Sequence, residues 1–303
     1  MNLEVQLSPK LRLANPVMTA SGTFGYGDEH ADFLDVQKLG AIVCKGTTFE
    51  PRDGNPQPRL AETPSGMLNS IGLQNIGVKA LVQDKAPVWA KWRVPVIVNI
   101  AGDSVEEYAQ VAAYLDGVPG IAGIEVNVSC PNVAAGGAAF GCRPEPAAGV
   151  TAAVRRATSL PMLVKLTPDT GDIVAVARAV ADAGADALTV INTIKGMAID
   201  VDRRRPVLGN VTGGLSGPAI KPVALWQVYL VAGAVGIPVV GCGGIMDYRD
   251  ALEFILAGAT AVQVGSAGFA NPRAPLDVLE GIEQFMQREG VDDINRLVGA
   301  ARR

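Results

Sequence analysis

Residues 121–132 have the sequence IAGIEVNVSCPN, in which a short apolar run ends in polar residues. The run from Ile121 to Val128 predicts a buried strand. The polar turn after it carries one cysteine, Cys130, and a long loop rich in Gly and Ala follows. Polar groups and a thiol at the end of a buried strand are typical of an active site, so Cys130 is our candidate catalytic residue.

The same kind of apolar run recurs along the chain. The eight candidate strands are 17–20, 41–44, 96–100, 124–128, 162–166, 187–191, 239–242 and 261–264. Strands that are apolar along their whole length are typical of parallel sheets covered on both faces. Helical patterns alternate with these strands, at 31–39, 76–91, 104–116, 146–158, 171–184, 220–235, 248–257 and 275–288.

Eight strand–helix pairs predict an α/β fold, a (β/α)₈ TIM barrel. The alternating pattern of residues 3–7 and 10–13 adds an N-terminal β-hairpin. An open doubly wound sheet is the alternative, but its usual GxGxxG motif after the first strand is absent. We therefore expect one domain, residues 1–303, with elaborated loops at the C-terminal face of the barrel.

Charge and cysteine spacing exclude several classes of protein. The net charge is −4 and no basic stripe runs along the chain, which disfavours nucleic-acid binding. The cysteines, Cys44, Cys130, Cys142 and Cys242, form no CxxC pair, and the chain has a single histidine. We expect no metal site and no iron–sulfur cluster in this chain.

The N-terminus and one uncharged segment bear on localisation. The first ten residues show no signal-peptide pattern, so the expected compartment is the cytoplasm and the thiols are expected to be free. Residues 222–246 carry no charge, a length that could suggest a membrane span. Pro238 and five glycines interrupt this segment, which instead predicts a buried helix, a turn and a buried strand.

Every predicted strand ends in a polar residue or glycine, at the end of the barrel where active sites form. These positions are Ser21-Gly22, Lys45-Gly46, Asn99, Asn127 with Cys130, Lys165, Asn192-Thr193, Gly243-Gly244 and Gly265-Ser266. Glycines after the last two strands allow backbone N–H groups to approach a phosphate. The pattern therefore predicts a phosphorylated ligand, either substrate or cofactor.

Two residue types at these strand ends indicate the chemistry. Lys165 lies inside an apolar strand, where it must face a polar pocket or an anion. It could form a Schiff base, as in an aldolase, or act as a fixed cation for a developing negative charge. The asparagines offer paired donors and acceptors, which suit a ligand with amide groups such as a pyrimidine or an isoalloxazine.

The chain resembles the dihydroorotate dehydrogenases over essentially its full length. The matching stretches are ASGTFGYG (20–27), KGTT (45–48), PRDGNPQPR (51–59), NSIGLQN (69–75), NVSCPN (127–132), VKLTP (164–168), INTIKGMAID (191–200), GGLSG (213–217), GCGGI (241–245) and VGSA (264–267). Several of them are similar to class 1B, the NAD-dependent type. Class 2 fits less well, because its members use serine as the base and this chain offers Cys130.

The resemblance implies FMN at the barrel mouth and assigns residues to it. The implied FMN contacts are Ser21, Lys45, Gly46, Asn99, Asn127, Lys165, Ile191, Gly217, Gly243, Gly244, Gly265 and Ser266. The implied substrate contacts are Lys45, Asn69, Ser70, Ile71, Gly72, Leu73, Asn127, Asn192 and Thr193. Cys130 is implied to remove the C5 proton of dihydroorotate while the C6 hydride passes to FMN, giving orotate for pyrimidine biosynthesis.

The resemblance also implies a partner. Class 1B enzymes pass electrons to NAD through an electron-transfer subunit that carries FAD and a 2Fe–2S cluster, in a heterotetramer of two catalytic and two electron-transfer subunits. Three other functions remain open: a Schiff-base lyase acting on a sugar phosphate, a flavin-dependent reductase of another pyrimidine or of uridine in tRNA, and a non-catalytic barrel. The lyase would be colourless, whereas the reductase would be yellow.

Overall fold

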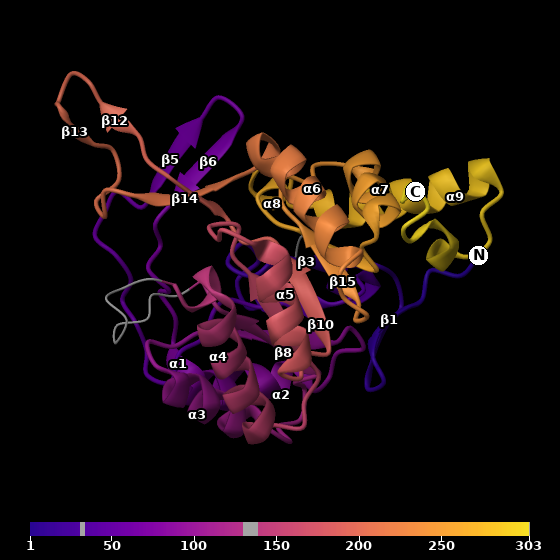
Figure 1. The fold of residues 1–303 in the computed structure, drawn as a ribbon, viewed down its shortest axis with the longest axis horizontal. Coiled ribbons are helices and arrows are strands. Elements are labelled where there is room, and N and C mark those ends of the chain that lie inside the picture. The colour runs from indigo at the N-terminus through magenta and orange to yellow at the C-terminus, as the bar shows by residue number, and fades with distance from the viewer. Residues whose placement is uncertain (31–33, 130–138, 303) are drawn as a thin grey trace.

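The computed structural model describes residues 1–30, 34–129 and 139–302 (Figure 1). Cys130, the candidate base, therefore lies outside the described residues, as do residues 31–33 and 303. Ser129 and Ala139 are the described residues on either side of segment 130–138.

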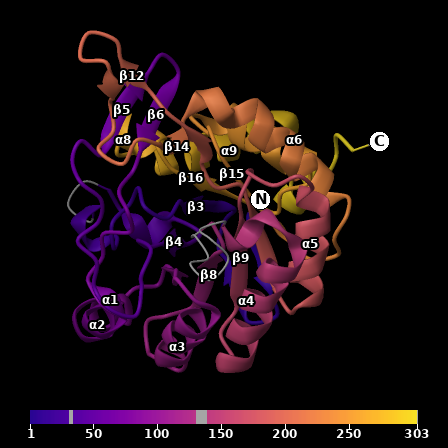
Figure 2. The same ribbon diagram turned by 60° about the vertical axis from the view of Figure 1, so that its left-hand side comes forward.

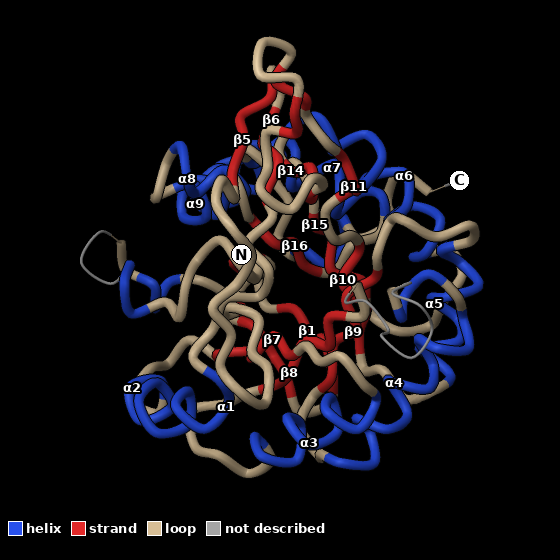
Figure 3. The backbone as a smooth tube through the Cα atoms, turned by 90° about the vertical axis from the view of Figure 1, so that its left-hand side faces the viewer, coloured by secondary structure: helices blue, strands red, loops and turns tan. Residues whose placement is uncertain are grey.

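Eight parallel strands form a barrel, as predicted. In sheet order they are β3 (Val17–Thr19), β16 (Ala261–Val264), β15 (Val239–Cys242), β10 (Ala187–Val190), β9 (Met162–Leu166), β8 (Gly123–Asn127), β7 (Val96–Ile100) and β4 (Ile42–Val43). A parallel bridge between Met18 and Ala41 joins the two ends of this order and closes the ring. Figure 3 shows the strands around the centre with the helices outside them.

Helices cover the outside of the ring and bury one face against it. They are α1 (Gly77–Ala80), α2 (Ala86–Trp89), α3 (Val105–Leu115), α4 (Pro144–Ala157), α5 (Ile173–Asp182), α6 (Lys221–Ala232), α7 (Tyr248–Ala257), α8 (Ala267–Ala270) and α9 (Ala274–Glu289). A π-helical turn, Leu81–Lys85, joins α1 to α2. Short 3₁₀ turns span Asp28–His30, Val36–Lys38, Phe140–Cys142, Pro218–Ile220 and Ile294–Leu297.

Side chains at the helix starts explain two of these boundaries. The hydroxyl of Ser104 accepts a hydrogen bond from the Glu107 amide at the start of α3. The carboxylate of Asp172 accepts from the amides of Val174 and Ala175 at the start of α5. Both residues cap otherwise unpaired N–H groups.

The helix predicted at 31–39 is wrong in its described part. Leu34–Leu39 contains only the 3₁₀ turn Val36–Lys38, which Asp35 caps through a hydrogen bond to the Gln37 amide. The chain then becomes extended at Leu39 and passes Gly40, where a Cβ would lie 2.1 Å from the Asn15 carbonyl oxygen. This close backbone contact ends the turn before a helix can form.

The barrel mouth carries an antiparallel arm that the sequence did not predict. Its four-stranded sheet has the order β11 (Ile194–Gly196), β14 (Gly213–Ser216), β6 (Gly66–Asn69) and β5 (Leu60–Thr63). A second ladder pairs β12 (Ile199–Asp200) with β13 (Arg205–Pro206). Figure 2 shows that β5, β6 and β12 project away from the helices.

The predicted N-terminal hairpin is present as β1 (Val5–Ser8) and β2 (Leu11–Leu13). Leu7 and Leu13 are fully buried in the core, and Figure 1 places the hairpin away from the arm. Residues 222–246 form most of α6, a turn and β15, as expected. Within the described ranges, no helix has both the length and the apolar character needed to span a membrane.

Candidate active site

A cavity lies at the C-terminal ends of the barrel strands, where the sequence predicts the site. Eight of the predicted cofactor-binding residues line it: Ser21, Lys165, Ile191, Gly217, Gly243, Gly244, Gly265 and Ser266. Two predicted substrate-binding residues, Asn192 and Thr193, line it as well. Residues from five separate strand ends therefore meet around one space, which is the arrangement a (β/α)₈ active site requires.

The glycines of this cavity have backbone conformations that other residues rarely adopt. The φ angles are +135° at Gly243, +74° at Gly244 and +94° at Gly217. A Cβ on Gly244 would lie 2.8 Å from the Gly217 carbonyl oxygen, so the two backbone segments pack without room for a side chain.

The same edge presents unpaired backbone donors. Five amides here donate to no backbone carbonyl of the described residues: those of Gly243, Gly244, Ile245, Gly265 and Ser266. Ile245 is buried and the other four residues are partly buried, and a group of backbone donors gathered at such an edge indicates an anionic ligand. Its position after β15 and β16 is where (β/α)₈ barrels bind phosphate.

Lys165 supplies the positive charge of the cavity. It projects from β9, is 4% exposed, and places Nζ 3.1 Å from Oε1 of Gln263 and 3.9 Å from Oε1 of Glu125. Burial alone would lower the pKa of Lys165, but Cys242 and Glu125 outweigh burial, and the pKa is raised above its ordinary value. Lys165 is therefore an ammonium ion at neutral pH, which disfavours the Schiff-base interpretation.

Cys242 also lines the cavity and contacts Lys165. Burial raises the pKa of the Cys242 thiol, although Lys165 opposes this effect. The thiol is protonated at neutral pH and attracts the Lys165 ammonium as a charge only once it ionises at alkaline pH, so Glu125 is the negative charge beside Lys165 at neutral pH. Cys44 and Cys242 are both buried, as expected, and Cys142 is partly exposed.

Two predicted asparagines are in direct contact. The Nδ2 of Asn192 donates to Oδ1 of Asn127 over 3.1 Å and to Oγ of Ser129 over 2.9 Å. The buried Tyr108 hydroxyl donates to the Asn127 carbonyl over 2.6 Å. These bonds fix the end of β8 immediately before Cys130.

The predicted substrate segment 69–73 also reaches this region. The Nδ2 of Asn69 donates to the Gly214 carbonyl over 3.2 Å, and a Cβ on Gly214 would meet Oγ1 of Thr193 at 2.1 Å. Asn69 and Thr193 therefore lie on either side of one strand, β14. Ser70 is held through its hydroxyl, which accepts a hydrogen bond from Asn55.

Four predicted cofactor-binding residues do not line the cavity: Lys45, Gly46, Asn99 and Asn127. Gly46 and Asn99 nonetheless lie close to each other and to Leu73, a predicted substrate-binding residue. A Cβ on Gly46 would lie 3.1 Å from Oδ1 of Asn99 and 3.3 Å from Cδ2 of Leu73. Lys45 is half-buried, and its amide donates to the Gly25 carbonyl over 2.8 Å.

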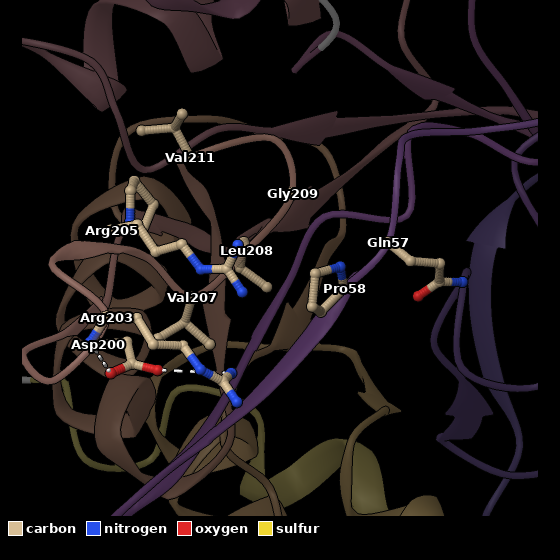
Figure 4. A pocket seen from close by; sticks show the side chains of 10 residues that line it. Gln57, Pro58, Asp200, Arg203, Arg205, Val207, Leu208, Gly209 and Val211 are labelled. Carbon is tan, nitrogen blue, oxygen red and sulfur yellow. Dashed lines mark hydrogen bonds and ion pairs between the residues drawn. The ribbon is translucent and has the colours of Figure 1, made fainter.

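A second, wider hollow of about 460 Å³ lies in the arm (Figure 4). Its lining residues are Gln57, Pro58, Asp200, Arg203, Arg205, Pro206, Val207, Leu208, Gly209 and Val211. None of them was predicted to bind cofactor or substrate. The hollow lacks the glycine amides and the buried cation of the barrel mouth, so we place the candidate site at the mouth.

Sequence reasoning missed the polar residues beneath the cavity. Glu125, Thr189 and Gln263 are fully buried inside β8, β10 and β16. The signal was present, because each is a polar residue in an otherwise apolar strand, as Lys165 is. Applied to every strand, the reasoning that singled out Lys165 would have found them.

Comparison with known proteins decides the family. The model of the dihydroorotate dehydrogenase family matches residues 3–286 of the chain. The chain belongs to the dihydroorotate dehydrogenase family. This membership confirms the resemblance drawn from the motifs, and it agrees with the barrel and with the position of the cavity.

Individual members of the dihydroorotate dehydrogenase family match the chain almost end to end. A protein of Desulforamulus reducens is 58% identical over 301 residues, which is 99% of each chain. Proteins of Trichlorobacter lovleyi and of Geobacter sp. strain M21 are 58% and 57% identical over 290 residues, 96% of this chain and 95% of theirs. All three are named dihydroorotate dehydrogenase B (NAD(+)), catalytic subunit.

Proposed function

We propose that the chain oxidises dihydroorotate to orotate as an FMN-binding catalytic subunit, within one domain spanning residues 1–303. The observation that carries this proposal is the cavity in which free glycine amides and a buried ammonium ion meet. The names of the relatives supply the substrate. The resulting activity belongs to pyrimidine biosynthesis.

The residues around the cavity fit FMN. The free amides from Gly243 to Ile245 and at Gly265 and Ser266 suit its phosphate. Lys165 suits negative charge on the ring system, because its ammonium is buried and points into the cavity. When bound, FMN supplies the hydride acceptor that no side chain provides.

The substrate side is assigned to Lys45, Asn69–Leu73, Asn127, Asn192 and Thr193. The Asn127–Asn192 hydrogen bond orients both amides, which suits the alternating N–H and C=O groups of a dihydropyrimidine. Lys45 would pair with the substrate carboxylate. Both asparagines lie beside Ser129, so they hold a ligand next to the Cys130 turn.

Cys130 is the proposed base, and it lies outside the described residues. It follows Ser129, whose amide donates to Oδ1 of Asn127 over 3.1 Å. As thiolate, Cys130 accepts the C5 proton while the C6 hydrogen leaves as hydride, which creates the C5=C6 double bond of orotate. A cysteine is poised for this near neutral pH when a positive field lowers its pKa.

The electrons are proposed to reach NAD through a second polypeptide. The sequence has no GxGxxG motif for NAD and no cysteine cluster for iron–sulfur. We propose an electron-transfer subunit carrying FAD and a 2Fe–2S cluster, in a cytoplasmic heterotetramer of two subunits of each kind. Assay of the purified chain alone tests this, and brisk NAD reduction by it would contradict the proposal.

The activity itself is tested with the purified chain under anaerobic conditions. We expect a yellow protein whose flavin absorbance falls when dihydroorotate is added, with one orotate formed per flavin reduced. A lyase would instead be colourless, and borohydride would trap its substrate on Lys165. A reductase of another pyrimidine would stay yellow on addition of dihydroorotate.

A further inference from the structure

A buried carboxylate lies at the centre of the barrel, beneath the candidate cofactor cavity. Glu125 is fully buried in β8, and its two oxygens accept hydrogen bonds from three other strands. Asn99 of β7 donates to Oε1 over 2.8 Å, while Thr189 of β10 and Gln263 of β16 donate to Oε2 over 2.8 and 2.6 Å. Three donors and no acceptor around one carboxyl group are the pattern of an ionised carboxylate.

Gln263 connects this carboxylate to the cation of the cavity. Its Oε1 accepts from Nζ of Lys165 over 3.1 Å, and its Nε2 donates to Glu125. The Nζ of Lys165 also lies 3.9 Å from Oε1 of Glu125. The side-chain amide of Gln263 therefore accepts from Lys165 with its oxygen and donates to Glu125 with its nitrogen. These two bonds fix Lys165 relative to Glu125.

We propose that Glu125 is a positioning residue that keeps Lys165 charged and holds its ammonium at the floor of the cavity. Asn99, Thr189 and Gln263 hold the carboxylate in place. The consequence for flavin chemistry rests on the proposed function, but the pairing of Glu125 with Lys165 does not. In this arrangement Glu125 contacts no ligand and acts only through Lys165.

Glu125 is the carboxylate that faces Lys165 among the described residues, and the other titratable neighbours are thiols. Two titratable groups face Lys165, namely Glu125 from β8 and the Cys242 thiol from β15. A third group, the Cys44 thiol directly after β4, lies near Glu125. Burial raises the pKa of Cys242, and it raises the pKa of Cys44 to about 12, so both thiols are neutral near pH 7. Among the described residues, Lys165 forms its ion pair with Glu125.

Loss of the carboxylate therefore has a defined effect. A lysine buried without a counter-ion favours the neutral amine, and its pKa falls by up to several units. Glu125→Gln keeps the size and one oxygen acceptor but removes the charge. We expect Lys165 in this variant to lose its proton within the range pH 6–9.5.

The primary test measures the protonation of Lys165 directly, by NMR titration of protein labelled with ¹³C at lysine Cε. The Lys165 signal is assigned from its absence in Lys165→Met. In the unaltered protein the Lys165 signal should not titrate between pH 6 and 9.5. In Glu125→Gln it should titrate within this range, with a midpoint at least about two pH units below that of the unaltered protein. A Lys165 signal that stays constant in Glu125→Gln overturns the proposal.

Two control variants separate charge from packing. Thr189→Val removes one hydrogen bond to the same carboxylate and keeps both charges, so Lys165 should remain protonated throughout. Glu125→Asp keeps the charge and should also keep Lys165 protonated. If Thr189→Val titrates as Glu125→Gln does, loosened packing is the cause and the assignment to charge is wrong.

The flavin supplies a second readout. In Glu125→Gln, the midpoint potential of bound FMN plotted against pH should show an additional break at the Lys165 midpoint, and this break should vanish in Glu125→Gln/Lys165→Met. If the chain binds no FMN, the proposed function fails while the lysine titration still tests the pairing.

If Glu125→Gln does not fold, the double variant Glu125→Gln/Lys165→Met should fold, because it leaves no unpaired buried charge. A double variant that also fails to fold overturns the proposal.

Discussion

The Glu125 carboxylate and the Lys165 ammonium lie 3.9 Å apart inside the barrel, on the paired strands β8 and β9. Burying two charges costs free energy that a well-packed apolar pair would not. Such a pair is more readily explained by chemistry at the neighbouring cavity than by stability. The first prediction concerns the cation of this pair.

Replacement of Lys165 by Met should impair flavin reduction strongly. The variant lacks the buried positive charge next to the developing negative charge, and one such electrostatic contact contributes roughly 10²–10³-fold to a rate. Stopped-flow reduction by dihydroorotate measures this loss, together with a lower midpoint potential of the bound flavin. Lys79→Met is the matched control, because Lys79 is exposed and its contacts are with the surface residues Glu50 and Phe49. Equal rates in both variants would refute the role of Lys165.

Replacement of Gly244 by Ala should abolish tight binding of FMN. The added Cβ meets the Gly217 carbonyl oxygen at 2.8 Å and the Lys221 amide nitrogen at 2.9 Å, at a φ of +74°. The backbone must move, and the free amides beside Gly244 move with it. Fluorescence titration of the apoprotein with FMN measures the dissociation constant.

The control for Gly244 is Gly149 of α4. A Cβ there meets nothing within 4 Å, and Gly149 lies in the interior of the helix. Gly149→Ala should leave FMN binding unchanged and raise the free energy of unfolding by about 0.5–1 kcal/mol. FMN binding by Gly244→Ala as tight as that of Gly149→Ala would show that the glycine edge is not the phosphate site.

Replacement of Tyr108 by Phe should destabilise the end of β8. The Tyr108 hydroxyl donates to the Asn127 carbonyl over 2.6 Å, and the change removes this bond from a partly buried acceptor at a cost of about 0.5–1.5 kcal/mol. Urea unfolding measures the loss. Tyr114→Phe is the control, because Tyr114 is 43% exposed. If both variants unfold at the same urea concentration, the bond does not stabilise this strand end.

Alkaline pH should destabilise the fold through its buried thiols. Burial raises the pKa of Cys44 to about 12, whereas an unfolded cysteine ionises near ~8.5. The unfolded chain therefore releases a proton that the folded chain keeps, and stability present below ~pH 8.5 is lost as pH rises toward 12. The slope per thiol reaches about 1.4 kcal/mol per pH unit.

Urea unfolding between pH 8 and 10 measures this slope. Cys44→Ala should show a smaller slope than the unaltered protein, while Cys142→Ala, at a partly exposed site, should retain it. An unchanged slope in Cys44→Ala would mean that another group, such as Tyr26 with its pKa raised to about 12 by burial, dominates the alkaline loss.

The barrel strands could be predicted from sequence because each is buried on both faces. The ranges of β7, β9, β15 and β16 agree with the predicted ones to the residue. The arm could not be predicted, because β14 consists of Gly213–Ser216, a pattern that favours a turn. It becomes a strand through pairing with β11 on one side and, on the other, with β6, far away in the chain.

Part of the candidate site could also be predicted from the sequence. Lys165 could be singled out because a cation in an apolar strand requires a partner, and the glycines because of their position after the last strands. Glu125 could be singled out in the same way, as a charged residue in the apolar strand β8, but its pairing with Lys165 could not be predicted from β8 alone. Its donors come from β7, β10 and β16, which meet only when the ring closes.

The assignment of Cys130 as the base of dihydroorotate oxidation is tested most directly by anaerobic stopped-flow reduction of the FMN-loaded chain. Cys130→Ser should retain bound FMN and show severely slowed flavin reduction by dihydroorotate at neutral pH, because a serine hydroxyl is far harder to deprotonate than a thiol. Cys142→Ser should be reduced at the normal rate. Normal reduction of Cys130→Ser would contradict the account, since the C5 proton would then have another acceptor.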